Sequence, residues 1–263
     1  MADGSIVLDL WFVRLPGDEN SYERLWNQID EHALEADLRL HLAENGFRAG
    51  VCGPQIPRPL EAILENDMSL QNDADEDSPP AEALESFNTN PKVKHRHLQI
   101  RPGMESRIVA SDVYDRISLL VSDRGQVSGK TVRKAQGIFT LRTASRPDHR
   151  VGLELVPAFH HGEPKQSYVP IDGGYGLDVS RPHEVYDQLQ IKTDLAPGEM
   201  LVLSRLPDRP GSLGDYFFRS SHTSSHGQKL LIIRLSQRPY DGLFDTETIR
   251  FASSKRGPTH QER

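Results

Sequence analysis

The sequence predicts an α+β protein in which a small N-terminal β-α-α-β-α module is joined by an acidic linker to a predominantly antiparallel β domain. Three observations lead to this prediction. Apolar residues recur at helical spacing within residues 1–65, an acidic stretch without Lys or Arg follows, and the second half alternates apolar and polar residues with a period of two. Many short strands separated by turn residues are typical of a sandwich or barrel-like β domain.

The predicted module spans residues 1–65 and begins with a strand. Residues 6–13 are apolar at both odd and even positions apart from Asp9, as in a strand that is covered on both faces. A helix is expected next, because apolar residues at i, i+3, i+4, i+7 and i+11 form one stripe. The residues of this stripe are Tyr22, Leu25, Trp26, Ile29 and Ala33.

Three more elements complete the module. A second helix is expected from about Glu35 to residue 45, where Gly46 permits the left-handed backbone at a helix C-terminus. Residues 47–52 can form a short strand. Pro57 is suited to the start of a third helix, because proline is tolerated in a first helical turn.

The predicted linker covers residues 66–91 and is expected to be disordered, as is the tail at 253–263. Between Asn66 and Asn90 there are seven acidic residues and no Lys or Arg. Such a composition favours a solvated tether between two domains. An acidic segment of this kind can also screen a basic face or dock onto a partner.

The β-rich domain is predicted for residues 92–252. Leu189, Ile191, Thr193 and Leu195 alternate with polar residues, and residues 151–155 repeat this period of two. The apolar runs at residues 201–203 and 230–235 are typical of buried strands. Pairs of Gly and Pro punctuate the intervals, as expected for turns.

Composition limits the classes of function. The formal net charge of -7 argues against nucleic acid as a partner, because phosphate binding needs a basic surface. No apolar run reaches the ~18 residues that a transmembrane helix requires. Cys52 is the single cysteine, so an intrachain disulfide is impossible. A cytoplasmic location is expected if Met1 is the native start, and a cell-envelope location if an upstream signal was removed.

One segment imitates a phosphate-binding loop. Gly125 and the run Gly129, Lys130 and Thr131 follow an apolar stretch, but three residues separate the two glycines where a phosphate loop has four. The following residues favour a strand or an irregular connection over a helix, so a helix N-terminus is not expected to face an anion. A hairpin turn at Gly125 is the favoured interpretation, and weak phosphate binding is the alternative.

Eleven histidines include three groups. His95 and His97 should point to one face of a strand, while the neighbours His160 and His161 should point to opposite faces. A third group, His222 and His226, has the i, i+4 spacing of a zinc site only if it is helical. Surface histidines are the favoured interpretation, so neither a metal site nor any cofactor is expected. No catalytic residue is assigned, because no nucleophile motif is present.

A glycine-rich aromatic segment at residues 211–218 permits two interpretations. Its glycines suit a tight turn and its aromatic residues supply a large apolar surface. A core plug beneath a sheet is favoured by burial statistics, and a contact with a protein partner or a second copy is the alternative. The residues assigned to this candidate interaction site are Gly211, Ser212, Leu213, Gly214, Tyr216, Phe217 and Phe218.

The order of three C-terminal elements resembles the C-terminal bacterial secretin domain. Leu-Ala-Pro-Gly-Glu-Met-Leu-Val-Leu at 195–203 precedes the glycine-rich aromatic segment, and an apolar strand follows at 230–235. The resemblance covers residues 150–237 and implies a β domain within an assembly in the cell envelope. Ser204 and Arg205 stand where the family has a glycine pair. The whole chain is also similar to uncharacterised bacterial proteins.

These observations predict a non-catalytic structural or protein-interaction protein, with protein partners or self-association. The alternatives are an enzyme or ligand-binding protein that uses His160 and His161, and a weak phosphate binder that uses Lys130.

Overall fold

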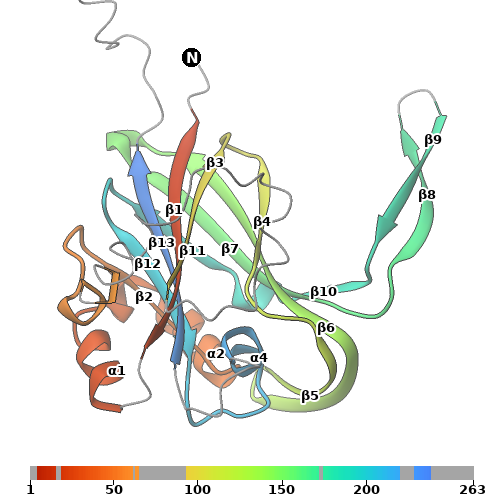
Figure 1. Cartoon of the computed structure of the whole chain (residues 1–263), viewed down its shortest axis with the longest axis horizontal. Helices are drawn as coiled ribbons and strands as arrows, with labels where there is room; N and C mark the ends of the chain where they lie inside the picture. The colour runs from red at the N-terminus through yellow and green to blue at the C-terminus, as the bar shows by residue number, and fades with distance from the viewer. Residues whose placement is uncertain are drawn as a thin grey trace, which may run out of the picture.

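The structure is a computed structural model that describes residues 5–15, 19–61, 63–64, 93–171, 174–219 and 228–237 (Figure 1). The predicted linker at 66–91, the predicted tail at 253–263 and the pair His222 and His226 lie outside the described residues. Within them, two antiparallel sheets pack against each other and share a hydrophobic core.

The first sheet, called sheet A, has the strand order β2-β12-β13-β1-β3, and every pair is antiparallel. Its strands are β1 (Ile6–Leu15), β2 (Phe47–Cys52), β3 (Val93–Ile100), β12 (Met200–Arg205) and β13 (Gln228–Gln237). Strands from both sides of the predicted linker therefore lie in one sheet. The linker predicted at residues 66–91 therefore separates two parts of the sequence whose strands belong to the same sheet, since β1 and β2 pair with later strands.

Both faces of β1 are covered, which explains its continuous apolar sequence. Leu8 and Leu10 pack into the core between the sheets, whereas Val13 and Leu15 pack into a second core on the opposite face of sheet A. Helix α1 (Glu19–Trp26) and the helical residues 58–61 and 63–64 supply the cover for this second core.

The second sheet, called sheet B, has the order β10-β7-β6-β4, with β11 also paired to β7 and β5 to β6. Strand β6 is 20 residues long, so its first half pairs with β5 while its second half pairs with β4 and β7 (Figure 1). The strands are β4 (Glu105–Val109), β5 (Tyr114–Asp123), β6 (Gln126–Ser145), β7 (Val151–His160), β10 (His183–Val185) and β11 (Ile191–Leu195).

A two-stranded ribbon of β8 (Lys165–Ile171) and β9 (Gly174–Ser180) extends from the body, and its two strands pair only with each other (Figure 1). The remaining short elements join the sheets. They are α2 (Ala36–Glu44), α4 (Leu213–Phe218) and the 3-10 turns η1 (Glu31–Ala33), η3 (Pro147–His149) and η4 (Asp187–Leu189).

The structure confirms the predicted α+β class and the β-rich second part, with sheets that are not closed into a barrel. The second predicted helix is α2, and Gly46 after it has a φ of 76°. The first stripe is only partly helical, because α1 ends at Trp26 and Ala33 is exposed in η1. No helix among the described residues is long and apolar enough to cross a membrane.

Candidate functional site

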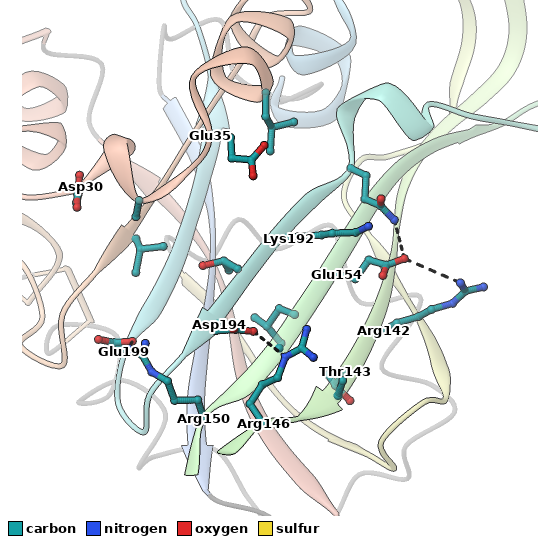
Figure 2. Close-up of a pocket in the computed structure, with 18 of the residues that line it drawn as sticks. Asp30, Glu35, Arg142, Thr143, Arg146, Arg150, Glu154, Lys192, Asp194 and Glu199 are labelled. Carbon is teal, nitrogen blue, oxygen red and sulfur yellow. Dashed lines mark hydrogen bonds and ion pairs between the residues drawn. The ribbon is translucent and has the colours of Figure 1, made fainter. Parts of the chain in front are cut away.

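A wide trough lies between strands β6, β7 and β11 on one side and the region of η1 and the start of α2 on the other (Figure 2). Its volume is about 1070 Å³. Charged side chains dominate its lining. The acidic ones are Asp30, Glu35, Glu154, Asp194 and Glu199, and the basic ones are Arg142, Arg146, Arg150 and Lys192.

Three arginines of the trough are held by carboxylates. Arg146 Nε lies 3.1 Å from Asp194 Oδ1, and Arg150 Nη2 lies 3.2 Å from Glu199 Oε2. Arg142 is shared, since it contacts Glu105 at 3.0 Å and lies 4.0 Å from Glu154. These side chains are between one quarter and just over one half exposed, so water reaches the ion pairs and screens them.

The pair between Arg146 and Asp194 crosses the backbone of β7 at Gly152. A Cβ atom at Gly152 would lie 2.8 Å from Arg146 Nε and 3.0 Å from Asp194 Oδ1. Because glycine has no side chain, the pair can close directly over the strand. Gly152 therefore shapes the floor of the trough.

Three charged side chains of the trough, those of Asp30, Glu35 and Lys192, make no ion pair among the described residues, and Asp30 accepts a hydrogen bond from the backbone N–H of His32. Glu35 precedes α2 and makes no capping hydrogen bond, and Lys192 is exposed on β11. Figure 2 shows Glu35 at the start of α2 and Lys192 on β11, with the Lys192 side chain directed toward Glu154. They can therefore meet a ligand without first leaving a partner within the chain.

The lining of the trough indicates what chemistry it can perform. Among the described residues that line it there is no His, Cys, Ser, Tyr or other aromatic residue. Stacking of sugars or bases uses aromatic rings, so this lining offers no stacking contact. The arrangement therefore suits a polar ligand that carries charges of both signs.

A smaller hollow of about 230 Å³ adjoins the trough and shares Arg142, Glu154 and Gln190 with it. His160 lines this hollow with His183, and their ring centroids are 5.3 Å apart. Burial, and next the positive charge of a protonated His183, lower the pKa of His160. His161 is not part of this lining, so the predicted pair of His160 and His161 does not form one site in the described structure.

The predicted placement of His95 and His97 on one face of a strand is confirmed. Both lie on β3, and their ring centroids are 4.4 Å apart. Asp9 of the neighbouring strand β1 contacts both rings. Their oxygen and nitrogen atoms form the one group of three possible metal ligands found among the described residues.

The candidate interaction segment at residues 211–218 lies inside the protein. Phe217 and Phe218 are fully buried, and Leu213, Gly214 and Ser212 are buried with them. The ring of Phe217 contacts the rings of Phe47, Phe139 and Phe159 at centroid distances of 4.8–5.3 Å.

The core interpretation accounts for this burial, and a partner has no access to these rings in this structure. Gly214 is required here because a Cβ atom would lie 2.0 Å from the carbonyl oxygen of Gly46. Gly211 has a φ of 77° and turns the chain into α4.

The candidate phosphate segment forms a hairpin and not a loop around an anion. Gly129, Lys130 and Thr131 lie in β6 and pair with residues 118–120 of β5. The turn is at Gly125, with a φ of 80°, as the favoured interpretation predicted. Lys130 is paired with Glu184, so its ammonium group already has a counter-charge. Phosphate binding by Lys130 would require its ammonium group to leave Glu184.

No protein-family model matches the chain, and the curated proteins and the solved structures likewise gave no match.

The trough was not predicted from the sequence, because its charged residues come from three regions that are far apart in the chain, 30–35, 142–154 and 192–199. Arg146, Lys192 and Glu199 are ordinary surface residues when they are considered singly. A polar site at Asp9 could have been predicted, since Asp9 is the one charged residue within the apolar stretch 6–13. A charge in a strand that is covered on both faces needs a polar partner.

Proposed function

We propose that the chain is a protein-interaction protein that binds an extended polypeptide segment of mixed charge in the trough. The observation that carries the proposal is that two exposed side chains of opposite charge, Glu35 and Lys192, line one trough and make no ion pair among the described residues. A peptide that carries a basic and an acidic residue can pair with both at once.

The charge balance of the lining favours a polypeptide over a nucleic acid. Five acidic and four basic side chains face the trough, so a phosphate backbone would meet more repulsion than attraction. The absence of aromatic residues from this lining removes the stacking that sugars and unpaired bases use. Protein partners, in contrast, are recognised through complementary charges that set the orientation of binding.

The exposed ion pairs of the trough support exchange of partners. An exposed pair such as that of Arg146 and Asp194 contributes only about 0.2–1 kcal/mol to stability. A bound peptide can therefore replace one member of a pair at little cost to the fold. For the same reason, such pairs can line a binding surface and still leave their charged groups available to a ligand.

The test is a selection of random 12-residue linear peptides on the purified full chain, followed by fluorescence anisotropy with the enriched peptides. We expect peptides that contain both Lys or Arg and Asp or Glu. Lys192→Glu and Glu35→Lys should each weaken binding by at least about 10-fold, because each replaces an attraction with a repulsion. The double variant should select peptides of reversed charge order.

Arg116→Glu is the matched control, because Arg116 is exposed on β5, outside the trough, and the substitution changes the net charge as Lys192→Glu does. This variant should bind the peptides like the parent chain. The proposal fails if no peptide is enriched, or if Lys192→Glu and Arg116→Glu have equal effects.

The secretin resemblance of residues 150–237 adds a finer form of this proposal, in which copies of the chain assemble in the cell envelope. These residues include β7, β11, β12 and β13. Mass in solution together with particle shape tests this form. Ring-shaped particles would support it, and a monomer at high concentration would contradict it.

A further inference from the structure

Asp9, His95 and His97 form a compact polar cluster at the edge of sheet A. Strand β3 is an edge strand, and β1 is its neighbour. The register places Asp9 directly opposite His97 and Trp11 directly opposite His95. Because alternate residues of a strand share a face, both rings lie on the side of β3 to which Asp9 points.

The distances within the cluster match those of a metal site. The candidate ligand atoms all lie within 4.8 Å of one another. His95 Nε2 is 3.3 Å and His97 Nδ1 is 2.5 Å from the same oxygen, Asp9 Oδ1. Ligand bonds of about 2.0–2.2 Å at tetrahedral angles place two ligand atoms roughly 3.3 Å apart. The His95 distance already meets this value, and the His97 ring would have to move by about 1 Å.

The side chains around the cluster hold two of its members in place. The Ser236 hydroxyl donates a hydrogen bond to Asp9 Oδ2, which leaves Oδ1 directed at both histidines. A register shift between β1 and β13 brings Ser236 to this position. The ring of Trp11 stacks on His95 with centroids 4.7 Å apart and planes 7° apart. Such outer contacts orient metal ligands in proteins.

Exposure differs among the three residues in the way an open metal site requires. The side chain of Asp9 is 11% exposed and that of His95 29%, whereas that of His97 is 71% exposed. The buried carboxylate supplies the negative charge, and the exposed side leaves room for water as a further ligand. The nearest cation in the register is Arg234, but its guanidinium lies beside Gly198 and makes no ion pair with Asp9.

We infer that Asp9, His95 and His97 bind a divalent transition-metal ion of the zinc type through two imidazole nitrogens and one carboxylate oxygen. Imidazole with carboxylate suits Zn²⁺ and the other late divalent ions, whereas Ca²⁺ and Mg²⁺ prefer oxygen ligands alone. Three protein ligands leave at least one coordination position for solvent. This inference is independent of the proposed function, and it departs from the sequence prediction of no metal site, which was made without Asp9.

The experiment is a Zn²⁺ titration of the full chain, purified without a polyhistidine tag and stripped with a chelator, against a chromophoric competitor. We expect one zinc ion per chain. His97→Gln and His95→Gln should each weaken binding by at least about 10-fold, and Ser236→Ala by a smaller factor. X-ray absorption at the zinc edge should show two imidazoles in a nitrogen and oxygen shell.

Two controls separate this site from other histidines. The double variant of His160→Gln and His183→Gln removes a second close histidine pair among the described residues, and that of His222→Gln and His226→Gln removes the pair with i, i+4 spacing in the sequence. Both should bind zinc like the parent. His97 is exposed, so His97→Gln should leave the circular dichroism spectrum unchanged. The inference is overturned if binding is not stoichiometric, or if His97→Gln binds zinc as tightly as the parent does.

Discussion

Charged side chains in the core and in the trough are of the same types but differ in their access to water. Asp215 in α4 is fully buried, and Arg205 and Arg219 both pair with it. Its carboxylate also accepts a hydrogen bond of 2.8 Å from the backbone N–H of Gly211. In the trough, Arg146 and Asp194 form a pair of similar length in which both side chains are about half exposed.

The difference indicates that burial, and not the presence of an ion pair, determines how much a charged side chain contributes to the stability of this protein. The Asp215 network fixes α4 against β12, because an unpaired buried charge is costly. The trough pairs contribute little to stability, since water can replace either partner. Charges that can change partners at low cost are suited to binding, and charges that cannot are suited to holding the fold.

The largest expected effect is that of Asp215→Ala. Removal of this carboxylate leaves Arg205, whose side chain is 18% exposed, without its counter-charge. We expect the free energy of unfolding to fall by about 3–5 kcal/mol, measured by urea denaturation. Asp194→Ala is the matched control and should cost less than about 1 kcal/mol. Equal losses in both variants would contradict the distinction between core and trough.

A second prediction concerns Lys229, a half-buried cation on β13. Its ammonium group donates to the carbonyl oxygen of Ala110 and lies 4.9 Å from the ring centroid of Phe12. The pKa of Lys229 is lowered to about 8, chiefly by burial; Asp112 raises it, and the positive charges of Arg14 and Lys94 lower it.

Between pH 8 and the unfolded-state pKa of about 10.5 the unfolded chain binds more protons at Lys229 than the folded chain does. Stability must therefore rise with pH in this window. We expect the free energy of unfolding to increase by about 1–2 kcal/mol from pH 7.5 to 9.5, relative to Lys229→Met. A parent chain whose pH profile runs parallel to that of Lys229→Met would show that this cation is solvated like those of the trough.

The smallest expected effect is the coupling between Arg146 and Asp194. A double-mutant cycle with Arg146→Ala and Asp194→Ala should give an interaction energy of about 0.2–1 kcal/mol, which decreases as salt is added. Thermal or urea unfolding at low and high salt measures it. An interaction energy above about 2 kcal/mol would contradict this prediction, because Arg146 and Asp194 would then stabilise the fold as the Asp215 network does.

Much of the fold was predictable because local patterns reflect burial. The alternation around Val151 and Leu195 predicted β7 and β11, and Gly46 predicted the end of α2. The core interpretation of Phe217 and Phe218 also agrees with the structure, since large aromatic residues are usually buried. The extent of β6 was harder to predict, because residues 126–134 alternate weakly and pair in a hairpin with one strand only.

The candidate sites were less predictable for a physical reason. His95 and His97 were recognisable as a pair on one face, but Asp9 joins them only through the register of two strands that are distant in the sequence. Glu35 and Lys192 line the same trough only because the fold brings β11 and the residue that precedes α2 to it. A single sequence shows periodicity within each segment, but it contains no direct record of the distances in space between segments.

By itself, the sequence determined the α+β class, most of the strands and the turn at Gly125, because these depend on period, apolar content and glycine geometry over a few residues. Tertiary structure alone decided that β1 lies between β13 and β3, that Asp215 is buried and that Asp194 is not. Strand order and burial are set by the sum of many long-range contacts. These contacts bury Asp215 in the core and leave Asp194 exposed to water in the trough.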